Sequence, residues 1–134
     1  MSGLVLKLAP KERILVNGAV IENGDKRTRF SIMTPNAHIL RLRDAIHPDE
    51  ASTPVRRAAY QVQLVLTGDI DPEAVRKDTL TRIEELSRIL VDNDSRRLLD
   101  QASDALLQER FYQCLKGLRA LIPREDRLLA AAQS

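Results

Sequence analysis

The chain has 134 residues, of which 43% are hydrophobic and 30% charged, so it fits one domain or a small sheet with a helical extension. It contains no run of about eighteen apolar residues, which excludes a transmembrane helix. Its start lacks a basic segment followed by an apolar one, so we expect no signal peptide and a cytoplasmic protein. A single cysteine, Cys114, excludes an internal disulfide and fits a reducing compartment.

Short runs of branched apolar residues, separated by turn residues, occupy the first third of the chain. They predict strands over residues 4–8, 13–16, 19–22, 29–34 and 39–43. Asn23-Gly24 favours a tight hairpin between the third and fourth runs, because type I′ turns need positive φ at both central residues. Asn17-Gly18 is compatible with a turn or a bulge. We therefore expect a small antiparallel sheet of four to five strands over residues 1–46.

The apolar residues of 47–134 recur at helical spacing and predict helices. Thr53-Pro54 and Asp71-Pro72 are each typical of an N-cap followed by proline in the first helical turn. The polar stretch 92–95 indicates a break and a third helix start. Gln108-Glu109 contains neither glycine nor proline, so one long helix and a helical hairpin both remain possible there.

Pro123 is expected to end the regular structure. Three to four amphipathic helices predict an internal bundle, with binding of a partner helix as the alternative use of the apolar stripes. The fold class is thus α+β: the small sheet, followed by a helical bundle or extension.

Charge is unevenly distributed along the chain. The net charge is +2, but residues 1–45 contain eight basic and four acidic residues, a net +4, which leaves −2 for the remainder. A basic sheet beside an acidic helical part suggests a polyanion partner for the sheet and a protein partner for the helices. The alternative is an ordinary solvated rim of charges.

No pattern of residues indicates catalysis. The sequence has no nucleophile motif, no zinc spacing of Cys and His, and no glycine-rich phosphate loop. His38 and His47 are interpreted as surface residues, and Cys114 as a small core residue. We expect neither enzyme activity, nor a metal, nor a cofactor.

Aromatic residues make up only 3% of the chain, and Phe30 is the one aromatic in the expected sheet. Stacking platforms of single-strand binders need aromatic faces. Any RNA recognition here would therefore use arginine, backbone groups and sheet edges.

Several motifs resemble known families. KERILV (11–16) and RFSIMTP (29–35), with the glycine turn between them, are similar to the carbon-storage regulators, which are small translational repressors. Over the whole chain, LKLAPKER (6–13), VNGAVIENGD (16–25), RLRDAIHP (41–48) and TPVRR (53–57) are more specific. On these residues the chain is identified as a member of the FlbT family of flagellin repressors.

The resemblance implies a function after transcription. FlbT-family proteins associate with the 5′ untranslated region of flagellin mRNA, lower its translation or lifetime, and work beside a small helical companion, FlaF. The carbon-storage regulators are intertwined dimers whose first and last strands pair across subunits, which implies a homodimer through the sheet. Their RNA site lies along those strand edges and uses basic residues.

Carried over to this chain, the resemblance places Lys7 on the first strand. An ungapped count from Pro35 places Leu42 where the regulators have their key arginine, with Arg41 and Arg43 on either side. Either arginine is a candidate, or the binding mode differs. By strand alternation Arg41 and Arg43 would point the same way. The full set of candidate RNA-binding residues is Lys7, Lys11, Arg13, Lys26, Arg27, Arg29, Arg41 and Arg43.

The resemblance therefore implies a post-transcriptional repressor that binds the flagellin mRNA 5′ leader. The alternative is a chaperone that binds flagellin, an assembly factor or the companion through its helices, without direct RNA contact. A plain structural subunit fits the composition but explains neither the basic sheet nor the strand order.

Overall fold

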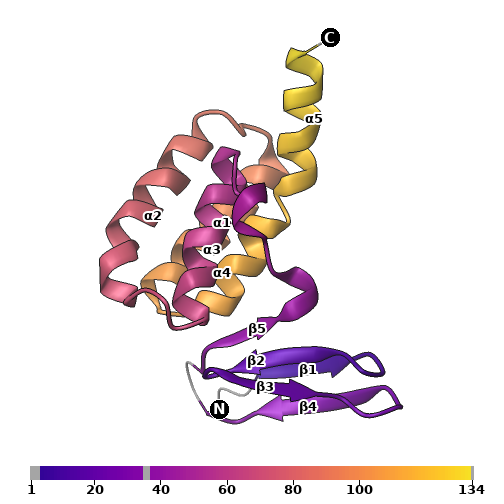
Figure 1. The fold of residues 1–134 in the computed structure, drawn as a ribbon. Coiled ribbons are helices and arrows are strands. Elements are labelled where there is room, and N and C mark those ends of the chain that lie inside the picture. Colours follow the sequence, from indigo (N-terminus) through magenta and orange to yellow (C-terminus); the bar gives the residue numbers. More distant parts are fainter. Residues whose placement is uncertain (1–3, 35–36, 134) are drawn as a thin grey trace.

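The computed structural model describes residues 4–34 and 37–133. Within these ranges five strands precede five α-helices (Figure 1). The strands are β1 (Leu4–Leu8), β2 (Arg13–Val16), β3 (Ala19–Glu22), β4 (Thr28–Ile32) and β5 (Ile39–Arg41). Two 3-10 turns, η1 (Leu42–Asp44) and η2 (Pro48–Glu50), lead to the helices α1 (Pro54–Leu66), α2 (Pro72–Ser87), α3 (Asn93–Leu107), α4 (Phe111–Arg119) and α5 (Ile122–Ala132).

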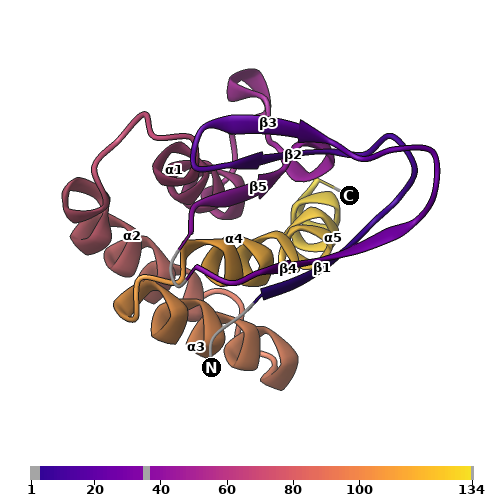
Figure 2. The same cartoon turned by 90° about the horizontal axis from the view of Figure 1, so that it is seen from below.

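The predicted α+β class, with four to five antiparallel strands before the helices, is confirmed: there are five strands, and they divide into two small sheets. One is the ribbon of β1 and β4, and the other has the order β3-β2-β5. Figure 2 shows both sheets from below, with the helices behind them. Because β1 pairs with β4, residues far apart in sequence become direct neighbours, such as Lys7 opposite Arg29.

The predicted hairpin at Asn23-Gly24 is wrong. The tight turn lies at Asn17-Gly18, where both φ angles are positive, and it joins β2 to β3. The Asn23 side chain is buried and donates to the carbonyls of Ala9 (2.8 Å) and Lys26 (2.9 Å). These bonds tie the loop after β3 to the loop after β1, so the chain leaves β3 and crosses to β1.

The last strand is shorter than the predicted 39–43. It ends at Arg41, and the chain then turns through η1. Arg41 and Arg43 nevertheless both reach Glu12. The 3-10 turn therefore brings the two arginines together, not the strand alternation from which this was predicted.

The helix starts follow the sequence closely. Thr53, Asp71 and Asp92 each accept a backbone hydrogen bond as N-caps of α1, α2 and α3. Of the two alternatives at residues 108–109, the structure shows two helices and not one long helix. Glu109, between α3 and α4, has a φ of 60°, which breaks the helix. The expectation that Pro123 ends the regular structure is wrong: it lies in the first turn of α5, where its missing N–H costs nothing.

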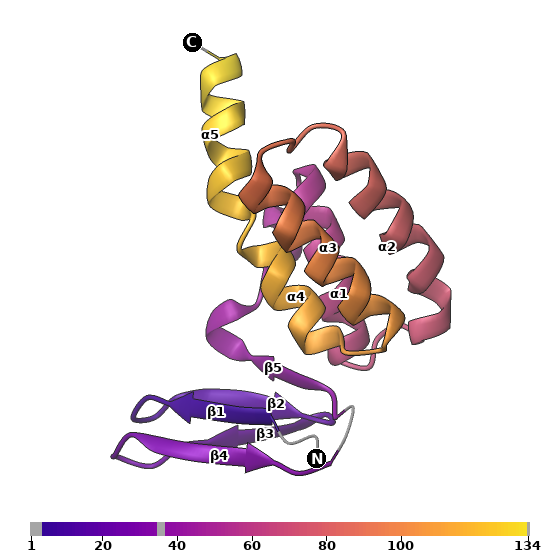
Figure 3. The same cartoon turned by 180° about the vertical axis from the view of Figure 1, so that it is seen from behind.

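The first four helices bury a common core, while α5 projects away from the bundle (Figures 1 and 3). That core also includes Leu40 of β5. A second core lies within the strands and is completed by Tyr112 of α4. Each of the two cores therefore includes a residue from the other part of the chain, and β5 packs against the helices. Within the described residues, no helix is both long and apolar enough to cross a bilayer.

Candidate nucleic-acid interface

A turn between β1 and β2 places Glu12 beside Arg41 and Arg43. Ala9-Pro10-Lys11-Glu12 has proline at the second position and a φ of 63° at Lys11, as a type II turn requires. The Glu12 amide donates to the Ala9 carbonyl at 3.1 Å, and the Ala9 amide donates back to Glu12 Oε1 at 2.9 Å. The turn thereby fixes the carboxylate against β5.

Arg41 meets this carboxylate side-on. Its Nε donates to Glu12 Oε2 at 2.7 Å, and its Nη2 donates to Oε1 at 2.8 Å and to the Lys7 carbonyl at 2.6 Å. The Arg41 hydrogen bonds lower the pKa of Glu12 from 4.5 to about 2, and Glu12 raises the pKa of Arg41 further above its usual value. Both side chains are at least nine-tenths buried, so this pair is a fixed cross-link between the two sheets.

Arg43 is placed differently. Its Nε lies 3.6 Å from Glu12 Oε2, which is an ion-pair distance but too long for a hydrogen bond, and its side chain is 58% exposed. The Glu12 carboxylate is already occupied by Arg41. Arg43 therefore keeps more donors available for a ligand than Arg41, whose Nε and Nη2 are both engaged.

A basic cleft opens between the β1–β4 ribbon and the end of β5. We call this the sheet cleft; its lining residues are Lys7, Leu8, Ala9, Arg27, Thr28, Arg29, Arg41 and Arg43. Lys7 and Arg29 are directly opposite in the ladder, where like charges repel. Within residues 4–34 and 37–133, neither they nor Arg27 form an ion pair with an acidic side chain. An anion would relieve this repulsion.

The other predicted residues lie elsewhere. Lys11 pairs with Asp25 at 2.9 Å, and Arg13 pairs with Glu22 at 2.8 Å. Lys26 is exposed on the loop before β4 and does not line the sheet cleft. Of the eight candidates, the structure brings together Lys7, Arg27, Arg29, Arg41 and Arg43.

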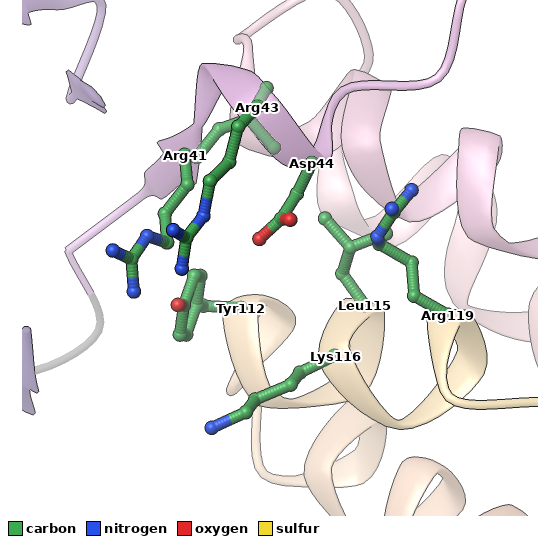
Figure 4. Close-up of a pocket in the computed structure, with 8 residues that line it drawn as sticks. Arg41, Arg43, Asp44, Tyr112, Leu115, Lys116 and Arg119 are labelled. Atoms are coloured by element: carbon green, nitrogen blue, oxygen red, sulfur yellow. The ribbon is translucent and has the colours of Figure 1, made fainter. Parts of the chain in front are cut away.

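A second cleft lies between η1 and α4, and we call it the α4 cleft. Its lining residues are Leu40, Arg41, Arg43, Asp44, Tyr112, Leu115, Lys116 and Arg119 (Figure 4). Lys116 and Arg119 were not predicted as functional residues. The signal for them was that α4 carries two cations and no acidic residue, unlike α2 and α3.

The side chains considered for catalysis have structural roles. Cys114 is buried, and burial raises the pKa of its thiol to about 12. His38 makes an edge-on contact with the Phe111 ring, and the exposed His47 caps η2. In the part of the chain that the structure describes, no group of three or more His, Cys, Asp or Glu side chains could hold a metal ion.

Comparison with known proteins decides the family. The family model described as "Flagellar protein FlbT" matches residues 4–129. The chain belongs to the FlbT family. This is a regulatory family of non-enzymes, and the identification made from the sequence motifs is confirmed. The match spans both the strands and the helices, so family membership extends over the whole fold.

Individual FlbT relatives align over nearly their full length. The chain is 36% identical over 128 residues to a "Probable flagellum biosynthesis repressor protein FlbT" of Rhodopseudomonas palustris (strain TIE-1), covering 95% of this chain and 98% of that one. It is 31% identical to the protein of the same name from Caulobacter sp. (strain K31), with 94% and 95% covered. It is 28% identical to the "Flagellum biosynthesis repressor protein FlbT" of Caulobacter vibrioides (strain ATCC 19089 / CIP 103742 / CB 15), with 98% and 92% covered. No solved structure matches the chain.

Proposed function

We propose that this FlbT-family chain is a cytoplasmic, post-transcriptional repressor of flagellin synthesis that binds the 5′ untranslated region of flagellin mRNA. The observation that carries the proposal is the sheet cleft. Its cations Lys7, Arg27 and Arg29 have no acidic partner among the described residues, and two of them oppose each other. Such an arrangement is unfavourable alone and favourable beside a polyanion.

The cations of the sheet cleft divide into four that bind the ligand and one that positions Arg43. Lys7, Arg27 and Arg29 bind phosphate oxygens, while Arg43 supplies a planar guanidinium that suits a phosphate or a guanine edge. Arg41 positions Arg43 through their shared carboxylate, Glu12. Bound RNA would then mask the start of translation or leave the message open to nucleases.

Base stacking has little part in this mechanism. Phe30 packs against the core between the strands, so the exposed face of the β1–β4 ribbon offers charge rather than an aromatic platform. Binding dominated by phosphate contacts releases counterions and must weaken as salt rises.

The test is binding of the purified full chain to a labelled flagellin 5′ leader across a salt series. We expect tight, salt-sensitive binding by the wild type. In Arg27→Gln/Arg29→Gln, loss of two contacts should reduce the slope of log K against log salt by about 1.4. Lys77→Gln/Arg96→Gln removes two exposed cations from α2 and α3, outside both clefts, and should bind like the wild type. Circular dichroism confirms folding of each variant.

Absence of leader binding by the wild type would overturn the proposal. Equal losses in the sheet-cleft and control variants would reduce it to nonspecific attraction by a basic surface.

We also propose a homodimer through the strands. Val5, Val20 and Met33 are large apolar side chains exposed on or beside β1, β3 and β4, where a second copy would cover them. Light scattering after size exclusion checks this: a monomeric mass at micromolar concentration would contradict it.

A second candidate function rests on α5, which projects from the bundle with Leu128 and Leu129 exposed (Figure 1). An apolar helix face of this kind suits a protein partner, such as flagellin or a FlaF-like helical companion. On this alternative the chain is a chaperone without direct RNA contact. Binding to such a partner should vary little with salt and should be lost in Leu128→Ser/Leu129→Ser.

A further inference from the structure

We propose that the α4 cleft is a second phosphate-binding subsite, so that the RNA path continues from the strands onto the helical bundle. This inference rests on the proposed RNA-binding function and extends it to residues of α4. The residues that carry it are Arg43, Lys116 and Arg119.

The two clefts lie next to each other. Arg41 and Arg43 line both of them, with Lys7, Arg27 and Arg29 on one side and Lys116 and Arg119 on the other. Glu12 holds Arg41 in place. The exposed Arg43 is therefore the residue that can contact a ligand in both clefts. An extended polyanion that contacts Arg43 from the strands would pass directly to α4.

Lys116 and Arg119 are available for a ligand. They lie three residues apart, which places them on one face of α4, and neither forms an ion pair within residues 4–34 and 37–133. Figure 4 shows Lys116 and Arg119 extending from α4 in different directions on either side of Leu115, with Arg43 and Asp44 across the cleft on η1. Cations in the last turn of a helix also favour its dipole, but that effect does not require them to line a cleft together with Arg43.

The floor of the α4 cleft is rigid. Leu115 and the Tyr112 ring are buried, and Tyr112 belongs to the core of the strands. The position of the α4 backbone against β5 is therefore set by packing, which fixes where the cationic side chains begin. Binding of phosphate then has to order only the side chains and not the helix.

Among the described residues, Asp44 is the one carboxylate that lines the α4 cleft, and it tests whether the cleft binds an anion or a cation. Beside a phosphate its negative charge opposes binding. Removing that charge should therefore tighten the complex. If the cleft instead bound a cationic or neutral donor group through Asp44, removing the charge would weaken it.

The first experiment measures binding of the full chain to the flagellin 5′ leader across a salt series. For Lys116→Gln/Arg119→Gln we expect about five- to tenfold weaker binding at moderate salt and a slope reduced by about 1.4, as for loss of two phosphate contacts. Lys77→Gln/Arg96→Gln is the matched control for charge and should retain the affinity and slope of the wild type. Thermal unfolding confirms that each variant is folded.

The second experiment uses Asp44→Asn, with Asp100→Asn on the exposed surface of α3 as its control. We expect Asp44→Asn to bind the leader about two- to threefold more tightly at low salt, and less so as salt screens the charge. Asp100→Asn should change the affinity by less than half of that effect. Weaker binding by Asp44→Asn would overturn the proposal.

The outcomes separate this inference from the proposed function. If the wild type binds the leader and the sheet-cleft variant is weakened, but Lys116→Gln/Arg119→Gln binds like the wild type, the RNA site is confined to the strands and the inference fails alone. If the wild type does not bind, both fail. Loss in both double variants, with a reduced slope in each, supports the continuous path.

Discussion

Glu12 and Arg41 are 29 residues apart and form two side-chain hydrogen bonds in a nearly buried site. Removing one partner of such a pair leaves the other charge uncompensated. We expect Glu12→Gln to lower the free energy of unfolding by about 3 kcal/mol at pH 7. Chemical denaturation of the two proteins gives this difference.

The same pair predicts a pH dependence. The pKa of Glu12 is lowered in the folded chain, so its stabilisation is complete above the unfolded pKa of 4.5 and is lost as pH falls toward the folded pKa of about 2. The stability difference between wild type and Glu12→Gln should therefore shrink steadily from pH 5 to pH 2. A difference that stays constant over this range would show that Glu12 acts by packing alone.

The opposition of Lys7 and Arg29 predicts that stability and RNA binding move in opposite directions. Lys7→Glu replaces a cross-strand repulsion by an attraction and should stabilise the fold by about 0.5–1 kcal/mol. It should also weaken leader binding, because a cation of the sheet cleft is lost. Thermal unfolding and RNA titration of the same sample measure both effects. Lys26→Glu, on an exposed loop without a cross-strand partner, should leave stability unchanged.

The glycines of the two Asn-Gly pairs, Gly18 and Gly24, should respond differently to replacement by alanine. Gly18 has a φ of 87°, which an alanine adopts only with strain, so Gly18→Ala should destabilise by about 1 kcal/mol. Gly24 lacks a positive φ and has open space around its Cα, so Gly24→Ala should be neutral or slightly stabilising. Urea denaturation of both variants tests this, and equal losses would contradict the placement of the turn.

Glu125 anchors α5 to the start of α1. Its Oε2 accepts from the Val55 amide at 2.8 Å, and its Oε1 accepts from the Thr53 hydroxyl, in a site that is 6% exposed. Glu125→Ala leaves these donors unpaired and should cost about 2 kcal/mol. The neighbouring Asp126→Asn breaks only an exposed pair with Arg56 and should cost less than about 1 kcal/mol. Hydrogen exchange should also be faster in α5 of Glu125→Ala than in the wild type.

The sequence by itself determined the five strands, the starts of the first three helices and the family. Four strands contain a short apolar run and β4 alternates polar with apolar residues. Each of the first three helices starts at a side chain that caps its own backbone. These are local effects, which depend on residues only a few positions apart. The FlbT motifs were readable for the same reason, since they are contiguous. Charge counting likewise identified the first third of the chain as basic, without its geometry.

Only the tertiary structure decided which strands pair and which cations are free. The Asn23 amide bonds to carbonyls 14 residues earlier and 3 later, and these overrode the turn that Asn23-Gly24 favours locally. Arg41 and Arg43 were equivalent in sequence, yet burial beside Glu12 occupies one and leaves the other exposed. Lys116 and Arg119 join the basic surface because Tyr112 packs α4 against the strands. Such contacts join distant segments, so no local pattern contains them.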